Sequence, residues 1–295
     1  MSHINRKYSI SKKSQAGLSL IELMVAMTLG LILLGGIIQI FLSSKQSYNS
    51  VMSSSQVLDN GRLALHFMNG ATAKAGYWGA DNDVTDRNYG ADTGLIADQY
   101  TGIFPENQWL FGENNDTSDA NVLDGTDELW LRFSGDADVP MITCTGEAVS
   151  STQIAIEHYF VRVLTGSEIL PSLVCESTIM GFDQASGIVT VPGTPSTNST
   201  VIISGVENMQ LQFGVLNNVG GENARFFSAN NITAVNWQRV NSISVSILAA
   251  SDNEVAPQDR TTGYQMLDVT TSAPNDKRAR RVFNQSTVLR NPNNI

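Results

Sequence analysis

The sequence predicts an α+β protein in which one long N-terminal helix precedes an antiparallel β-sheet domain with long loops. Three observations predict this class. Residues 18–42 form an apolar run in which Glu22 is the single charged residue. No proline occurs before Pro105, so nothing forces a helix to break until the glycines near Gly70 and Gly76. Further along the chain, short runs alternate apolar and polar residues with the period of a β-strand.

The apolar run at 18–42 is long enough to cross a membrane. Its 25 residues rise about 1.5 Å each in a helix and span roughly 37 Å, more than the hydrocarbon core of about 30 Å. Residues 1–17 contain no acid and four basic residues, Arg6, Lys7, Lys12 and Lys13. The positive-inside rule therefore predicts a cytoplasmic leader at 1–17 and an exported remainder, with the N-terminus in and the C-terminus out.

The helical pattern continues in amphipathic form over residues 43–76. Apolar residues recur at helical spacing, at Val51, Leu58, Leu65 and Met68, while serines occupy other faces. The simplest interpretation is one helix from about residue 18 to residue 74. Its outer half is expected to pack on the C-terminal sheet.

Residues 77–295 are predicted to form an exported, β-rich globular domain. Segment 77–127 is rich in Asp, Asn and Gly, which indicates long ordered loops with short strands. Strands are expected at 128–133, 153–163, 187–191, 201–203, 209–215, 243–247 and 281–289. The strands at 209–215 and 243–247 alternate apolar and polar residues, which is typical of half-buried antiparallel strands. Residues 192–200 are expected to be a turn or loop, and 251–278 a polar stretch.

Composition indicates an acidic, exported, folded chain. It has 42% hydrophobic and 16% charged residues, which favours a globular protein over a disordered one. Removal of residues 1–17 takes away four of 18 basic residues and none of 28 acidic ones, so the net charge changes from −10 to −14. So acidic a domain is a poor general binder of nucleic acid. Cys144 and Cys175 both lie beyond the membrane, so we expect a disulfide between them, the alternative being two separate buried thiols.

The residues around the start of the apolar run resemble a known signal. Lys12-Lys13-Ser14-Gln15-Ala16-Gly17 followed by Leu18-Ser19-Leu20-Ile21-Glu22 is similar to the class III signal of type IV prepilins and pseudopilins. The resemblance implies cleavage by prepilin peptidase between Gly17 and Leu18, and N-methylation of Leu18, although Phe or Met is commoner at that position. It also implies that Glu22 pairs with the N-terminal amine of a neighbouring subunit during filament assembly.

Physical chemistry agrees with that role for Glu22. A carboxylate at the centre of a membrane span costs about 2.5–3.5 kcal/mol on insertion scales, and less near an end, so an ammonium group beside it is stabilising. The alternative is a plain membrane anchor that tolerates a glutamate near its end.

Several later segments resemble the PilW family of minor pilins. These are residues 75–79, 205–214, 240–248 and 280–291, although Ala80 stands where many relatives place a cysteine. The resemblance implies the pilin-like lollipop, a long helix packed on an antiparallel sheet domain, and a minor pilin that helps to initiate type IV pilus assembly at the pilus tip. Twitching motility, adhesion and DNA uptake are the processes that it implies.

The same resemblance implies partners and a location. The expected partners are prepilin peptidase, other minor pilins, the major pilin, a tip adhesin, and the inner membrane with its assembly platform. The expected location is the bacterial inner membrane before assembly and the pilus tip at the cell surface afterwards.

Residue patterns for catalysis and cofactor binding are weak, so the sequence predicts no enzyme and no cofactor. The histidines are His3, His66 and His158, and no phosphate loop, paired zinc-ligand motif or dinucleotide fingerprint is present. Two groups of loop acids offer oxygen ligands to calcium, Asp81, Asp83 and Asp86, and Asp116, Asp119 and Asp124. Neither group has EF-hand spacing, and solvated loop charge is the favoured interpretation.

One basic cluster stands out, at Lys277, Arg278, Arg280 and Arg281. It could meet DNA or an acidic partner pilin, but a solvated strand edge is the favoured interpretation, and nucleic acid is not expected to be the primary partner.

Two alternative functions share some of these features. A minor pseudopilin of the J type, from a type II secretion system, would carry the same signal and helix. A membrane-anchored binding module for sugar, DNA or a surface would instead use the aromatic residues between 77 and 111.

Overall fold

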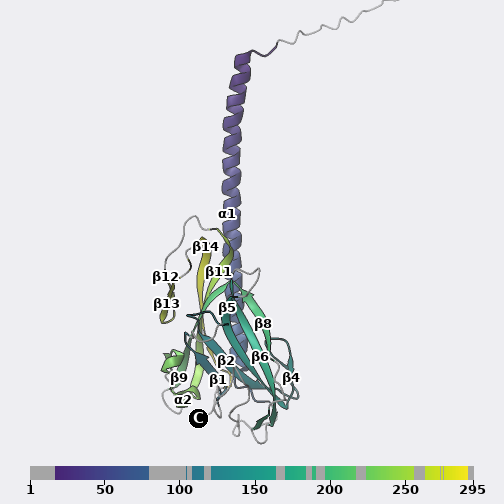
Figure 1. Cartoon of the computed structure of the whole chain (residues 1–295), viewed down its shortest axis with the longest axis vertical. Coiled ribbons are helices and arrows are strands. Elements are labelled where there is room, and N and C mark those ends of the chain that lie inside the picture. Colours follow the sequence, from purple (N-terminus) through teal and green to yellow (C-terminus); the bar gives the residue numbers. More distant parts are fainter. Residues whose placement is uncertain are drawn as a thin grey trace, which may run out of the picture. The chain divides into compact units, whose positions relative to one another are not determined.

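We analysed a computed structural model of the chain, drawn in Figure 1. It describes residues 17–79, 104, 108–115, 121–163, 170–183, 188–190, 197–216, 224–255, 263–272, 274 and 276–291. The chain divides into two compact units, Met1–Asn49 and Ser50–Ile295. Residues 50–76, assigned from the sequence to the amphipathic part of the helix, therefore belong to the globular unit.

The fold class is the predicted one, a long apolar N-terminal helix with a C-terminal antiparallel sheet domain. The α1 helix runs over Leu20–Lys74, close to the expected bounds. In the order of the chain, the strands of the larger sheet are β1 (Leu110–Glu113), β2 (Glu128–Ser134), β5 (Gln153–Val163), β6 (Pro171–Asp183), β7 (Ile188–Thr190) and β8 (Thr197–Ser204). They are ordered β1-β2-β5-β6-β7, with β8 also paired to β6.

A second sheet has the order β10-β9-β11-β14. Its strands are β9 (Val206–Leu216), β10 (Ala224–Phe227), β11 (Val240–Glu254) and β14 (Arg278–Val288). Two small hairpins complete the strands, β3 (Met141–Ile142) with β4 (Ala148–Val149), and β12 (Gly263–Met266) with β13 (Val269–Ser272). A 3-10 turn at Ala229–Asn231 and the short helix α2 at Ala234–Trp237 lie between β10 and β11.

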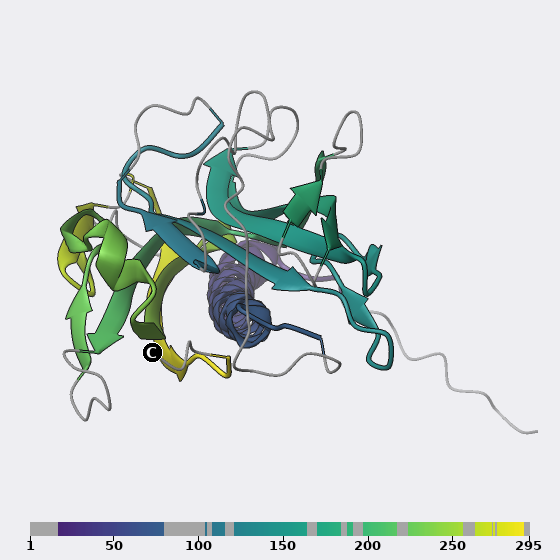
Figure 2. The same cartoon turned by 90° about the horizontal axis from the view of Figure 1, so that it is seen from below.

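Within the globular unit, strands of both sheets lie around the outer half of α1, as Figure 2 shows. Its buried residues, Ser53, Val57, Gly61, Ala64, Leu65, Met68, Ala71 and Thr72, recur every three or four positions. The predicted apolar face was partly wrong, because Val51 is exposed while Ser53 and Val57 are buried. Gly61 permits the close approach of β14, since a Cβ there would lie 2.2 Å from the Phe283 ring.

The strands β9 and β11 are buried on both faces, so the prediction that they are half-buried was wrong. On one face, Ile243 of β11 pairs with Thr287, whose hydroxyl contacts Asn69 of α1 at 3.0 Å. On the other face, Asn208 and Gln210 donate hydrogen bonds to the Gly125 carbonyl. The helix thus covers one side of the second sheet and the 121–127 segment covers part of the other.

Two other expectations need correction. Residues 197–200, expected in a turn or loop, begin β8. The polar stretch 251–278 contains the end of β11 and the β12–β13 hairpin. Both strand segments are rich in Ser, Thr and Asn, whose low apolar content hides the strand period.

Candidate functional site

The first candidate site is the beginning of α1, where the predicted cleavage and assembly residues lie. Gly17, Leu18 and Ser19 are non-helical, and α1 begins at Leu20. The Ser19 N–H donates to Glu22 Oε2 at 3.0 Å, and the Glu22 N–H donates to Ser19 Oγ at 3.2 Å. These reciprocal bonds are a capping box, which satisfies two N–H groups that a helix end leaves free. The Ser-x-x-Glu pattern is a signal of a helix start that the sequence carries locally.

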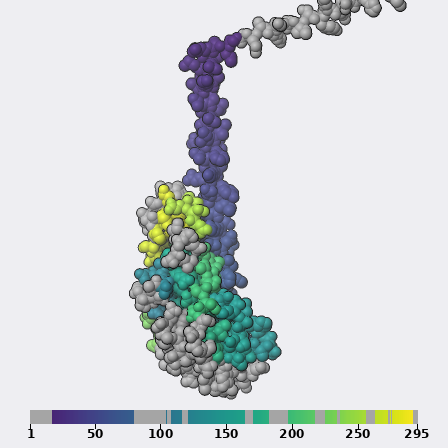
Figure 3. All heavy atoms as spheres, turned by 45° about the vertical axis from the view of Figure 1, so that its right-hand side comes forward, coloured from purple at the N-terminus to yellow at the C-terminus, as the bar shows by residue number. Residues whose placement is uncertain are grey.

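The inner half of α1 presents its apolar side chains outward, as Figure 3 shows in purple. Large side chains from Leu18 to Leu42 are between 47% and 78% exposed. By length and composition, α1 is the one helix in the described part of the chain that could cross a membrane. Gly17, Gly30, Gly35 and Gly36 have no neighbouring atom that a Cβ would meet. Nothing within the described chain therefore requires glycine at these positions.

The second candidate site is the disulfide between Cys144 and Cys175, the pair expected from the sequence. Cys144 lies between β3 and β4, and Cys175 lies in β6, a strand that was not predicted. The bridge ties the β3–β4 hairpin to the centre of the larger sheet.

Beside this disulfide, Glu157 is a fully buried carboxylate with three partners. Its Oε1 lies 2.6 Å from Lys74 Nζ at the end of α1 and accepts the Cys144 N–H at 2.7 Å. Its Oε2 accepts the Tyr159 hydroxyl at 2.9 Å. Burial and the Glu157 charge raise the pKa of Tyr159, so this phenol stays a donor. These contacts join the helix, the hairpin and β5, which is a structural role.

The basic cluster near β14 is not the solvated strand edge that was expected. Although β14 is an edge strand, the Arg280 side chain is fully buried. Its guanidinium lies 2.5 Å and 2.8 Å from the two carboxylate oxygens of Glu207, and 2.5 Å and 2.7 Å from those of Asp276. These hydrogen bonds hold the pKa of Asp276 below its ordinary value. Lys277 and Arg281 are the exposed members, and the Arg281 guanidinium lies over the Phe283 ring.

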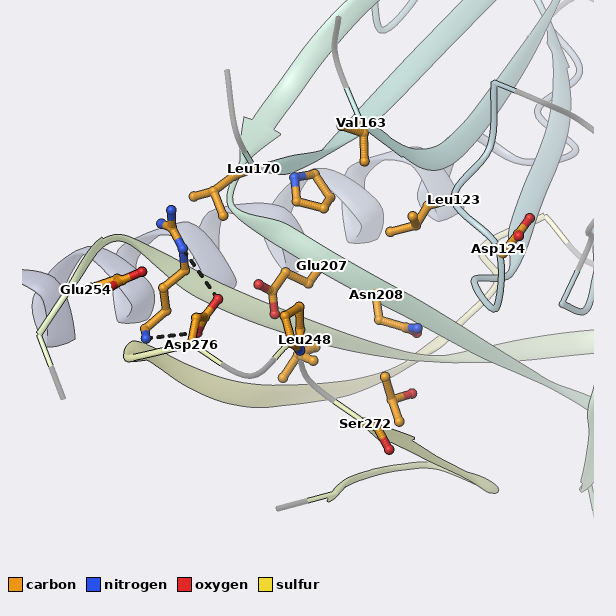
Figure 4. Close-up of a pocket in the computed structure, with 14 residues that line it drawn as sticks. Leu123, Asp124, Val163, Leu170, Glu207, Asn208, Leu248, Glu254, Ser272 and Asp276 are labelled. Atoms are coloured by element: carbon orange, nitrogen blue, oxygen red, sulfur yellow. Dashed lines mark hydrogen bonds and ion pairs between the residues drawn. The ribbon is translucent and has the colours of Figure 1, made fainter. Parts of the chain in front are cut away.

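A pocket of about 510 Å³ opens beside this cluster (Figure 4). Its lining combines Leu123, Val163, Leu170, Pro171, Leu248 and Pro274 with Asn208, Thr271 and Ser272, and with the charged Asp124, Glu207, Glu254, Asp276 and Arg278. Four carboxylates against one guanidinium make this lining unfavourable for anions. Arg278 Nε lies 3.6 Å from Asp276 Oδ2, so its cation is already engaged.

Two further buried titratable groups lie at the start of β2. Asp127 accepts the Leu211 N–H at 2.7 Å and the Asn115 N–H at 3.1 Å, while burial raises its pKa to about 7. Its neighbour Glu128 lies 2.6 Å from Nε2 of His158, whose ring stacks between Trp130 and Phe160 at centroid distances of 4.2 Å and 4.4 Å. His158 is thus a strand residue, as predicted.

The calcium prediction falls mostly outside the described residues. Asp81, Asp83, Asp86, Asp116 and Asp119 lie outside them, and Asp124 is exposed at the pocket rim. Among the residues that the structure describes, no three His, Cys, Asp or Glu side chains are grouped as metal ligands.

Two family models match the chain. A family model described as Type IV Pilus-assembly protein W matches residues 158–291, from β5 through β14. A second, described as the prokaryotic N-terminal methylation motif, matches residues 12–38, which include Gly17, Leu18 and Glu22. No curated protein matches the chain.

One similar solved structure is a type IV-like pilin from Thermus thermophilus. It has a TM-score of 0.43 and 14% sequence identity, and the match covers 80% of this chain and 97% of that chain.

The methylation motif matches the start of the apolar helix α1. The pilus-assembly model matches a region that includes the strands β9, β11 and β14 of the second sheet. The first model is described as a pilus-assembly protein, and the second matches the start of a helix that is long and apolar enough to cross a membrane. The comparisons thus support a type IV pilin-like minor pilin that resembles the PilW family over residues 158–291 and carries the methylation motif at 12–38.

Proposed function

We propose that the chain helps to initiate type IV pilus assembly at the pilus tip. In this proposal it enters the bacterial inner membrane with its N-terminus in the cytoplasm and is cut by prepilin peptidase between Gly17 and Leu18. The amine of Leu18 is then methylated, and the subunit joins other minor pilins, the major pilin and a tip adhesin. Adhesion, twitching and DNA uptake are downstream consequences rather than reactions of this chain.

One observation carries the proposal: the only charge of the apolar run, Glu22, lies at the helix start inside the matched methylation motif. In a lipid environment this carboxylate would gain from a cation nearby, and a neighbour's N-terminal ammonium supplies one. The open space around Gly17 supports a requirement set by a peptidase, because the chain's own packing sets none. The family match over 158–291 favours a pilus over the type II secretion alternative.

The first test is intact-mass and N-terminal peptide analysis of the chain expressed with and without prepilin peptidase. A chain that begins at N-methylated Leu18 only when the peptidase is present is the expected result. Retention of residues 1–17 in both samples would contradict the proposal and favour the plain anchor.

A second test separates assembly from cleavage. Glu22→Gln keeps an oxygen that can accept the Ser19 N–H but removes the charge, so incorporation into sheared pili per cleaved subunit should fall at least tenfold. Arg281→Gln, at an exposed position of β14, is the matched charge-removal control. Equal incorporation of Glu22→Gln and wild type would remove the proposed charge pair.

A further inference from the structure

The peptide bond proposed for cleavage lies just outside α1. Gly17, Leu18 and Ser19 precede the first helical residue, Leu20. Gly17 and Leu18 are exposed, Leu18 by 78%, so the bond between them is open to an enzyme. Where α1 begins therefore decides whether this bond is extended or helical.

A helix that began one turn earlier would need particular backbone hydrogen bonds. Because an α-helix pairs each N–H with the carbonyl four residues before it, Glu22 N–H would have to donate to Leu18, and Ile21 N–H to Gly17. In the structure, Glu22 N–H donates to Ser19 Oγ instead. The first helical bond runs from Leu23 N–H to the Ser19 carbonyl, at 3.2 Å.

The second half of the capping box works in the same direction. Ser19 N–H would donate to the Gln15 carbonyl in a longer helix, but it is held by Glu22 Oε2 at 3.0 Å. Two of the N–H groups that a longer helix would need, those of Ser19 and Glu22, are thus occupied by side chains of the box. The Ser19 hydroxyl is the acceptor that keeps Leu18 out of the helix.

We propose that Ser19 is a positioning residue for processing, which ends α1 just after the cleavage site and presents the Gly17–Leu18 bond extended. The reaction is hydrolysis: water adds across the bond, Gly17 leaves as a carboxylate and Leu18 gains the amine. Ser19 acts through the helix end and takes no part in bond breaking. This inference rests on the proposed function, which supplies the peptidase.

The test is a time course of cleavage of the full-length precursor in membranes that contain prepilin peptidase. The fraction of chains that begin at Leu18 is measured by intact mass and divided by the membrane-inserted precursor. Ser19→Ala removes the cap, whereas Ser19→Asn keeps a good N-cap without the hydroxyl. Ser44→Ala is the matched control, an exposed serine inside α1.

Ser19→Ala should be cut about two- to thirtyfold more slowly, the factor that corresponds to loss of an N-cap. Ser19→Asn and Ser44→Ala should be cut like wild type, and this rescue would support the cap as the cause. If Ser19→Ala is cut at the wild-type rate, the role of Ser19 is contradicted while the proposed function is unaffected. Slow cleavage of Ser19→Asn would also overturn it, because the enzyme would then read the serine itself. If the wild-type chain is not cut, the proposed function fails instead.

Discussion

Replacing Arg280 with methionine tests whether the buried ion cluster holds β14 to the second sheet. Methionine keeps much of the length of the side chain but removes the guanidinium that binds two carboxylates. Glu207 is only 7% exposed and Asp276 21%, so neither regains full hydration when its partner is lost. The perturbation therefore leaves two adjacent carboxylates, one of them nearly buried, without their shared cation.

The expected loss follows from that burial. Removing one member of a buried ion pair costs about 3–5 kcal/mol, because the remaining charge stays desolvated and unpaired. For a unit of this size, 1 kcal/mol corresponds to about 2–4 °C in Tm, so Arg280→Met should lower Tm by roughly 6–20 °C. Arg281→Met is the matched control on the same strand. Its guanidinium is exposed over Phe283 and should contribute at most about 1 kcal/mol.

Urea unfolding of the full chain in detergent micelles, with the disulfide intact, provides the assay. All four tryptophans, Trp78, Trp109, Trp130 and Trp237, are buried in the globular unit, so their fluorescence reports its unfolding. Near-ultraviolet circular dichroism should give the same midpoint if the transition is two-state.

The pH dependence identifies the cause of the loss. Arg280 lowers the pKa of Asp276, so that contribution to wild-type stability is present above pH 4 and lost as pH falls through the folded-state pKa. The gap between wild type and Arg280→Met should therefore shrink at low pH. Equal losses for Arg280→Met and Arg281→Met at pH 7, or a gap that does not change with pH, would refute the ion-cluster explanation.

Three further predictions concern the same transition. Burial raises the pKa of Asp127 to about 7, so the folded state keeps a proton that the unfolded state loses. Wild-type stability should fall by up to about 4 kcal/mol through this group between pH 4 and pH 7, a slope that Asp127→Asn should lack in urea titrations. Alanine at both Cys144 and Cys175 should cost about 3–4 kcal/mol, and reductant should then have no further effect, unlike in wild type. Gly205→Ala should cost at least about 1–2 kcal/mol, because Gly205 has a φ of +78° and its Cβ would lie 2.8 Å from the Ala250 carbonyl oxygen; an unchanged midpoint would contradict this.

The helix could be predicted from the sequence because its signals are local. An apolar run, the absence of proline and the charges of the leader lie within adjacent residues, and the Ser19–Glu22 box was readable in the same way. The signals for the strands at 128–133 and 209–215 were also local, since a period of two shows within a few residues.

The missed features depend on partners far away in the chain. The β6 strand begins with a proline and mixes Ser, Cys, Glu and Thr, yet it pairs with β5 from Pro171 to Gly181. Arg280 looked like surface charge because Glu207, 73 residues away, gives no local sign of its approach. The serines of β11 looked solvent-facing, but Ser244 is buried and hydrogen-bonded to Ser286. In each case the burial or pairing of the residue comes from segments that are distant in the sequence, so no short stretch of sequence predicts it.

The capping box also changes how the assembly step should be understood. A bare carboxylate in a membrane would gain the whole energy of a new ion pair, but Glu22 is already an acceptor for Ser19 N–H in the free chain. Pairing with a neighbour's ammonium either exchanges this bond or adds to it through the second carboxylate oxygen. If the bond is exchanged, the net gain in free energy is smaller than that of the ion pair alone. The loss of incorporation caused by Glu22→Gln should then be the same with serine or alanine at position 19. If the new bond is added to it, the helix end that the Ser19 hydroxyl stabilises also positions Glu22. Ser19→Ala keeps the backbone N–H but loses the hydroxyl that accepts Glu22 N–H, so it should then weaken incorporation even of chains that have been cleaved.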